Sequence, residues 1–289
     1  IAVAGILANV INIMVFTKQG FKDNVNLSLF CLAIADFCSL LTLIVTCVLS
    51  HPRFLGTGNN FVGIEVQFLV ACWPHVCFTK MTGWITAFIM FERCMCVALP
   101  LTVKTVLTKA RVQFCLVTIY VCVIAGVIPT YATHSLGWKF YPGFNRTLLG
   151  LQFDDWAIEV TYVSNLLNIP VSSISSFSLT FVCTVVISFL LVKKRKWRKA
   201  NGCLPNKASH QMSGNDHRAV KMVTVVSVIF LVSVTPSIAI IIGTVLFIEF
   251  SLTGKYRRLF YMCYCVSFVL EAINSSVNIL VYYNMNVRF

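Results

Sequence analysis

Charged side chains are scarce in this sequence. Only 11% of its 289 residues are Asp, Glu, Lys or Arg, and only 10 are acidic, whereas 58% are hydrophobic. A soluble domain of this length needs more polar surface than this to cover its apolar core. The composition, with a mean hydropathy of +0.83, therefore excludes an ordinary soluble protein and predicts one that lies within a lipid bilayer.

Apolar stretches that are long enough to cross a bilayer recur along the whole chain. The hydrocarbon layer is about 30 Å thick and a helix rises about 1.5 Å per residue, so a crossing takes roughly 20 residues. Such stretches lie at about 1–17, 27–50, 64–91, 112–133, 163–192, 219–248 and 259–283. The sequence thus predicts an all-α membrane protein, a seven-transmembrane helix bundle that forms a single domain over residues 1–289.

Basic residues gather in the joints after the first, third and fifth stretches. They are Lys18, Lys22, Lys104, Lys109, Arg111, Lys193, Lys194, Arg195, Lys196 and Arg198, the last five opening a polar third loop at about 193–218. By the positive-inside rule these joints are cytoplasmic, so the N-terminus lies outside and the C-terminus in the cytosol. The net charge of +13 is expected to meet anionic lipid and cytosolic protein, and no nucleic-acid partner is expected.

A glycosylation sequon supports this orientation. Asn145, followed by Arg146 and Thr147, lies in the joint after the fourth stretch, which the basic residues place outside. Only sequons on that side of the membrane receive sugar. Asn145 is therefore the expected acceptor of a glycoprotein.

Internal repeats and spaced sets of metal ligands are not evident in the sequence. Inverted repeats are typical of many transporters, so their absence from the sequence argues against a transporter. A catalytic zinc site needs grouped His, Cys, Asp or Glu, so we expect neither an enzyme nor a resident cofactor. One candidate function is that of a membrane transporter or channel that relays ions through Asp36, Lys80 and Glu271, because these ionisable residues lie inside apolar stretches.

Polar side chains inside the apolar stretches are the candidate functional residues. Asp36 offers only acceptors when ionised, so it needs a hydrated polar pocket, a cation or a proton. Asn274, Asn278 and Tyr282 are spaced four residues apart and share one helix face, which is expected to face Asp36. A lone asparagine is more often explained by hydrogen bonds between helices.

The third stretch combines several polar residues. His75, Thr82 and Arg93 share one helix face at different depths, whereas Lys80 lies roughly on the opposite side, so its pairing with Glu271 is left open. His75 and Glu271 either contact a ligand or satisfy each other. In the sixth stretch, Pro236 removes a backbone hydrogen bond and predicts a static bend or a pivot.

The order of these residues resembles that of the rhodopsin-like, class A, G-protein-coupled receptors, and the resemblance covers the whole chain. The stretch CWPHVCFTKMTGWITAFIMFERCMCV, with LPLTVKTVLT after it, is also similar to peptide-receptor-like and chemosensory orphan receptors of molluscs. The matching features are Asn9 in ILANVINIMVF, Asp36 in LAIAD, Glu92-Arg93-Cys94 with Pro100 seven residues later, Phe230 and Pro236 in the sixth stretch, and NSSVNILVY in the seventh.

The resemblance implies a role for each group of residues. Asp36, Thr82, Asn274, Ser275 and Asn278 match the pocket that holds an allosteric sodium ion in this family. The family's ionic lock and G-protein contact would involve Arg93, paired with Glu92 and Asp216, together with Tyr282, and its hinge would involve Phe230 and Pro236. The expected function is a plasma-membrane receptor that binds an extracellular neuropeptide or chemosensory cue and activates a heterotrimeric G protein.

Some residues depart from the family's pattern. Phe68 stands where a cysteine of the outer disulfide is usual, so that bond is expected to be absent or rewired through Cys72 or Cys77. His75 replaces the aspartate of amine receptors, and no lysine stands where visual pigments bind retinal, so neither ligand is favoured. The remaining candidates for the ligand pocket are His75, Lys80 and Glu271.

Overall fold

Long helices dominate the computed structural model, which describes residues 1–21, 23–51, 54, 60–99, 102–154, 156–166, 170–200, 214–247, 249–250 and 254–285. The long helices are α1 (Ala2–Gln19), α2 (Asn24–Leu49), α5 (Trp73–Ala98), α7 (Lys109–Thr133), α9 (Ser172–Ala200), α10 (Gly214–Leu246) and α11 (Arg257–Met285). Shorter ones are α4 (Gly63–Gln67), α6 (Val103–Val106) and α8 (Ala157–Leu166), and η1 (Phe68–Cys72) is a π-helical turn that joins α4 to α5.

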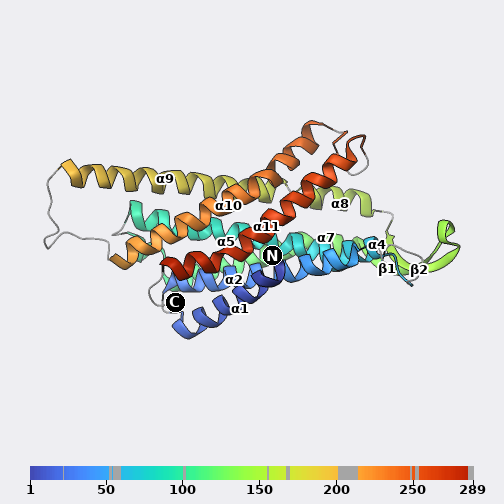
Figure 1. Ribbon diagram of the computed structural model, residues 1–289, viewed down its shortest axis with the longest axis horizontal. Helices are drawn as coiled ribbons and strands as arrows, with labels where there is room; N and C mark the ends of the chain where they lie inside the picture. Colours follow the sequence, from blue (N-terminus) through green and yellow to red (C-terminus); the bar gives the residue numbers. More distant parts are fainter. Residues whose placement is uncertain are drawn as a thin grey trace.

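Seven helical segments in the described residues are long and apolar enough to cross a membrane. They run side by side along the longest axis of the molecule, as Figure 1 shows. The outer surface of α7 indicates what surrounds the bundle. An apolar stripe at helical spacing is at least 50% exposed there, formed by Phe114, Val117, Val121, Ile124 and Ile128. Such an apolar stripe is stable only against hydrocarbon. The chain is therefore a multi-pass helical membrane protein, as its composition predicts.

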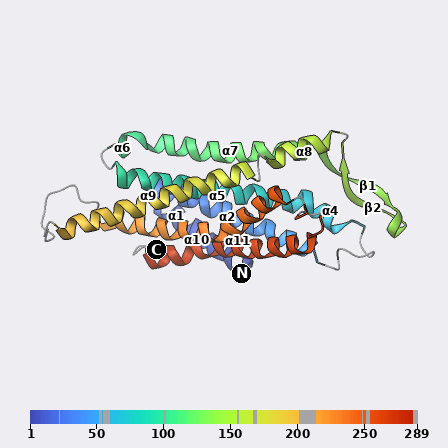
Figure 2. The same ribbon diagram turned by 90° about the horizontal axis from the view of Figure 1, so that it is seen from above.

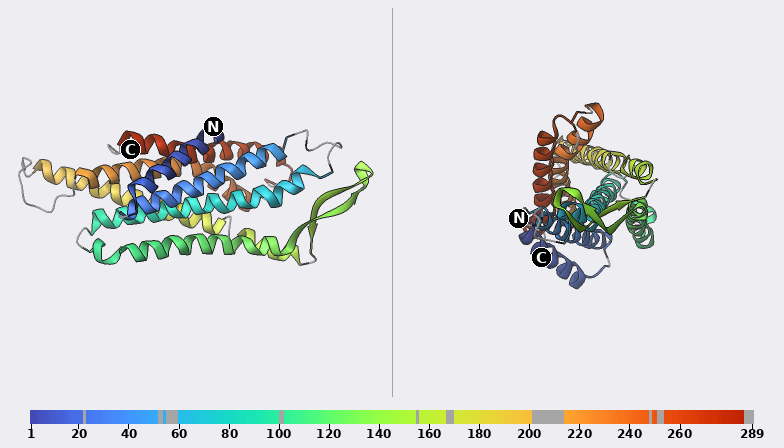
Figure 3. Two further views of the ribbon diagram at one scale, coloured as in Figure 1. Left: turned by 90° about the horizontal axis from the view of Figure 1, so that it is seen from below. Right: turned by 90° about the vertical axis from the view of Figure 1, so that its right-hand side faces the viewer.

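The segment that contains α5 is the most enclosed of the seven. The most apolar 18-residue stretch of this segment is 61% buried, compared with 22 to 44% for the corresponding stretches of the other six. α5 packs against α2, α7, α9 and α10, and the end-on view in Figure 3 shows the other helices gathered around it. Polar side chains on α5 are therefore surrounded by protein and have to find partners on neighbouring helices.

The prediction of an all-α chain needs one correction. Strands β1 (His134–Tyr141) and β2 (Arg146–Phe153) pair antiparallel in the joint after α7, and this β-hairpin projects from one end of the bundle in Figure 2. A 3-10 turn, η2 (Pro142–Phe144), and Asn145 with φ of 48° close the hairpin. Asparagine suits this turn because it tolerates the left-handed conformation that the reversal requires. The side chain of Asn145 is exposed.

The predicted ends of two stretches and of the third loop also need correction. The fifth stretch, expected at 163–192, is divided between α8 and the longer α9, and α10 begins at Gly214. Both ends of the loop predicted at about 193–218 are therefore helical, and its middle, 201–213, lies outside the described residues. The basic run after residue 192 continues α9 because lysine and arginine are good helix formers and the helical hydrogen bonds do not depend on the membrane.

A close contact between α1 and α11 fixes the height of the polar residues on α11. A methyl group on Gly5 would overlap the Ser276 hydroxyl and lie 2.7 Å from Leu40 Cδ1, so only glycine permits this approach. Asn9 is completely buried, and its Nδ2 donates to the carbonyl oxygens of Gly5 at 3.0 Å and Ser275 at 2.7 Å. These bonds hold the backbone of α11 at Ser275, which itself belongs to the candidate site.

Candidate functional site

Asp36 lies at the centre of a buried polar cluster formed by α2, α5 and α11. Its carboxylate is fully buried. Oδ1 accepts hydrogen bonds from Thr82 Oγ1 at 2.9 Å and Ser275 Oγ at 3.0 Å, and Oδ2 accepts one from Asn278 Nδ2 at 2.8 Å. The structure thus brings four of the five residues of the predicted sodium pocket into direct contact, and these hydrogen bonds stabilise a charge that burial alone would disfavour.

The same cluster has oxygen atoms that remain available to a cation. Asn274 is buried, and its Oδ1 and the Oδ1 of Asn278 have no hydrogen-bond partner among the described residues. Within that part of the chain, no basic side chain lies within the 4.0 Å ion-pair distance of Asp36. A carboxylate, hydroxyls and amide oxygens are ligands for a hard cation, so the residues present fit a sodium ion. No group of three or more His, Cys, Asp or Glu in the described ranges forms a transition-metal site.

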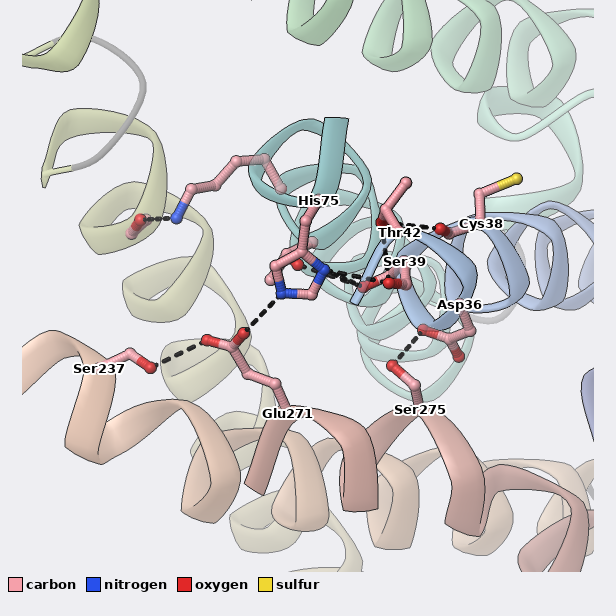
Figure 4. A network of polar contacts seen from close by, with 11 residues as sticks. Asp36, Cys38, Ser39, Thr42, His75, Ser237, Glu271 and Ser275 are labelled. Atoms are coloured by element: carbon pink, nitrogen blue, oxygen red, sulfur yellow. Dashed lines mark hydrogen bonds and ion pairs between the residues drawn. The ribbon is translucent and has the colours of Figure 1, made fainter. Parts of the chain in front are cut away.

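A second polar cluster contains His75 and Glu271. His75 Nε2 lies 3.5 Å from Glu271 Oε2, and Ser237 Oγ donates to Glu271 Oε1 at 3.0 Å. On its other side, His75 Nδ1 lies 3.0 Å from the carbonyl oxygen of Ser39 and 3.4 Å from Ser39 Oγ. Figure 4 shows these side chains converging from α2, α5, α10 and α11. The structure thus places His75 and Glu271 against each other within ion-pair distance, although His75 Nε2 forms no hydrogen bond among the described residues.

The two clusters lie about one helical turn apart. Ser39 follows Asp36 by three residues on α2, and Glu271 precedes Ser275 by four residues on α11, so the same two helices carry both clusters on adjoining turns. Figure 4 shows Asp36 and Ser275 beside Ser39 and Glu271. We call the two clusters together the polar column; it spans adjoining turns of α2 and α11 inside the bundle.

Lys80 does not take part in this column. Its Nζ donates a hydrogen bond to Ser173 Oγ on α9, and one turn further along α5 the indole of Trp84 donates to Ser172 Oγ at 3.0 Å. The sequence left open a pairing of Lys80 with Glu271. The two residues form no ion pair within 4.0 Å, and Glu271 lies nearer to His75, but the charges of Lys80 and Glu271 still interact electrostatically. The opposite-face position that the sequence predicts for Lys80 accounts for the lack of a direct ion pair.

The expected pairing of Arg93 with Glu92 needs correction. Glu92 is only 1% exposed, and its Oε2 accepts a hydrogen bond from Ser28 Oγ of α2 at 3.0 Å. Within the described part of the chain, no carboxylate lies within 4.0 Å of the Arg93 guanidinium, and Arg93 Nε has no hydrogen-bond partner. Successive helical residues point about 100° apart, so Glu92 faces α2 and is directed away from its neighbour.

The remaining candidates of the lock and hinge lie on α10 and α11. The side chains of Asp216 and Tyr282 lie outside the described residues. Phe230 is buried, and Pro236 lies inside α10, where it cannot donate to the carbonyl four residues earlier. The thiol of Cys94, the unusual third residue of the Glu-Arg-Cys motif, interacts with the thiol of Cys183 on α9.

An anchor of the β-hairpin was not predicted from the sequence. Glu65 of α4 accepts hydrogen bonds through Oε2 from the Tyr141 hydroxyl at 2.6 Å and the Leu151 amide at 2.7 Å. Lys139 Nζ lies 3.3 Å from the same oxygen and donates to the Leu151 carbonyl at 3.1 Å. We call Glu65, Lys139, Tyr141 and Leu151 the hairpin anchor. Sequence separations of 74 or more residues between Glu65 and these partners leave no local signal that could have revealed it.

Electrostatic effects favour the protonated forms of both titratable hairpin residues in this anchor. Burial raises the pKa of Tyr141, and its hydrogen bond to the Glu65 carboxylate raises that pKa further. Partial burial lowers the pKa of Lys139, but its contacts with Tyr141 and Glu65 outweigh this effect and raise the pKa above its ordinary value. Of the two alternatives for the outer disulfide, absent or rewired through Cys72 or Cys77, the second is wrong, because both thiols are free.

The structure therefore unites the residues of the Asp36 cluster and pairs His75 with Glu271, while it separates Lys80 from them and Arg93 from Glu92. These clusters share burial within a membrane bundle, where a polar side chain raises the free energy unless it has a partner, and where such side chains often mark functional sites.

No protein-family model matches the chain, and no curated protein matches it.

Proposed function

We propose that this protein is a plasma-membrane receptor of the class A type, which binds an extracellular peptide or small molecule and activates a heterotrimeric G protein. The observation that carries the proposal is the polar column, in which Asp36 accepts three hydrogen bonds and the His75–Glu271 pair lies one turn away. A buried carboxylate with spare oxygen ligands around it suits a two-state bundle, because a cation or proton stabilises one state more than the other.

In this proposal the β-hairpin faces outward and the end of α5 that bears Arg93 faces the cytosol. The distribution of basic residues supports this orientation, since α9 ends in a lysine- and arginine-rich run and the hairpin does not. Exposure of Asn145 at the hairpin turn is compatible with its glycosylation.

The mechanism links ligand binding to the cytosolic face through the column. Ligand contact near His75 and Glu271 alters the bonds of Ser39 and Ser237, and therefore the positions of α2 and α10. When bound, a sodium ion would supply positive charge to the Asp36 carboxylate. Asp36, Thr82, Ser275 and the two asparagines rearrange as α10 pivots at Pro236, which lacks the hydrogen bond that stiffens other helical positions. Movement of α10 then uncovers Arg93 for the G protein.

A transporter or channel would use the ionisable residues differently. It would relay ions along a chain of Asp36, Glu271 and Lys80. Lys80 is bonded to α9 and forms no direct contact with the column among the described residues, so that chain is interrupted. The receptor accounts better for the arrangement.

Nucleotide exchange by a G protein tests this proposal. We expect the purified receptor in lipid nanodiscs to accelerate guanine-nucleotide exchange on at least one class of heterotrimeric G protein, and Arg93→Ala to return the rate to that of the G protein alone. Arg257→Ala, at an exposed arginine at the start of α11, is the matched control and should keep the wild-type rate. A cell reporter screen with neuropeptides and water-borne odorants would then identify the agonist.

One result of these measurements would contradict the receptor proposal. Receptor proteoliposomes that conduct sodium ions or protons, without accelerating exchange on any G protein, would contradict the receptor proposal and favour the transporter.

A further inference from the structure

Lys80 places a part-buried ammonium group at the interface of α5 and α9. Its ammonium group has three hydrogens to donate, and the structure gives it one neutral acceptor, the Ser173 hydroxyl. Within the described residues, no carboxylate lies within 4.0 Å of Nζ. An ammonium group that is partly removed from water and has no direct ion-pair partner is unfavourable, and an ionisable residue at membrane depth usually marks a functional partner.

Glu271 acts electrostatically on the Lys80 charge, but its carboxylate lies beyond 4.0 Å from Nζ. Both oxygens of Glu271 face other groups: Oε1 accepts from Ser237 Oγ at 3.0 Å, and Oε2 lies 3.5 Å from His75 Nε2. Glu271 therefore forms no direct ion pair with Lys80.

The surroundings of Lys80 favour a ligand with an anionic head group. Ser173 is buried, and its hydroxyl can donate to an anion while it accepts from Lys80. Ser172, one position earlier on α9, accepts from the Trp84 indole, which leaves its own hydroxyl hydrogen to donate. Two hydroxyls and an ammonium thus lie along one short stretch of the α5–α9 interface, and no carboxylate of the described residues lies within 4.0 Å of that ammonium.

We propose that Lys80, with Ser173, recognises a carboxylate group of the receptor's ligand. This inference rests on the proposed function and narrows it, since it assigns an acidic ligand where the sequence left the ligand open. The carboxylate displaces Ser173 as the main partner of the ammonium and accepts from both residues.

Ligand-observed fluorine NMR can test the inference with simple probes. We expect 6,6,6-trifluorohexanoate to bind wild-type receptor nanodiscs more strongly than empty nanodiscs, and 6,6,6-trifluorohexanol to show no such difference. Lys80→Gln should weaken trifluorohexanoate binding at least about tenfold, because a hydrogen bond to a charged group contributes about 1.5–3 kcal/mol. Lys80→Arg, which keeps the cation, should bind within a few fold of wild type and shows that the site tolerates substitution.

Controls separate the inference from general charge effects and from the receptor function. Lys255→Gln, at an exposed lysine, should leave binding unchanged. A trileucine peptide with a free carboxyl terminus, compared with its amidated form, distinguishes a peptide ligand from a small acid. Equal binding of the acid and the alcohol, or unchanged binding by Lys80→Gln, overturns the inference. Lys80-dependent binding without nucleotide exchange on any G protein would leave the anion site standing and remove the receptor function instead.

Discussion

Replacing Asp36 with asparagine is expected to abolish the stabilisation of the protein by sodium. The wild-type thermal unfolding temperature in nanodiscs should be higher in sodium chloride than in choline chloride at equal ionic strength. At a sodium concentration 100 times the Kd, binding to the folded state alone contributes about 2.7 kcal/mol. Asp36→Asn removes the charge that attracts the cation but keeps an oxygen that can accept from Thr82 and Ser275.

A matched control makes this result specific. Asp154→Asn removes a carboxylate at an exposed position just after β2, and its variant should retain the full difference between the two salts. If Asp36→Asn keeps the sodium effect, the cation does not bind in the Asp36 cluster. The unpartnered oxygens of Asn274 and Asn278 would then need another explanation.

Gly150→Ala is expected to release the β-hairpin from α4. A methyl group at this position would overlap the Tyr141 hydroxyl and lie 2.6 Å from Glu65 Oε2, closer than packed atoms approach. Both groups belong to the hairpin anchor, so at least one of its hydrogen bonds has to break. Because charge-assisted bonds contribute about 1.5–3 kcal/mol, hydrogen exchange at the Leu151 amide should become roughly ten- to hundredfold faster.

The hairpin itself contains the control for this experiment. Gly143 lies in the turn, and a methyl group there meets no atom within 4 Å, so Gly143→Ala should leave exchange at Leu151 unchanged. Unaltered exchange at Leu151 in Gly150→Ala would show that the anchor accommodates the extra methyl group and that glycine is not needed there.

The predictable features of the molecule are those with a local signal. The seven membrane-spanning helices could be predicted because each apolar run is long enough to cross the hydrocarbon layer as a helix. Helical spacing likewise places Asn274 and Asn278 on one face of their helix. The contact of that helix with Asp36 joins residues about 240 positions apart, so the membership of Thr82 and Ser275 was expected from the family resemblance and not from a local signal.

Pairings across long sequence distances could not be predicted in the same way. Glu92 bonds to Ser28, 64 residues earlier, and Lys80 bonds to Ser173, 93 residues later. In each case several helices offered a partner, and packing decided among them. The adjacency of Glu92 and Arg93 was misleading because neighbours in a helix face different directions.

The hairpin anchor has a consequence for how the protein acquires its outer surface. The joint from Thr133 to Tyr162 contains no cysteine, and Cys72 and Cys77 are free thiols, so attachment of the hairpin requires no oxidative folding step. Dithiothreitol should therefore leave exchange at Leu151 unchanged, whereas a faster rate would reveal a disulfide. Alkali should act instead, because the pKa values of Tyr141 and Lys139 are raised above their ordinary 10.0 and 10.5. Their contribution is complete below those ordinary values and is lost as pH rises through the raised ones. Proton loss in strong base, and not reduction, is what detaches this surface.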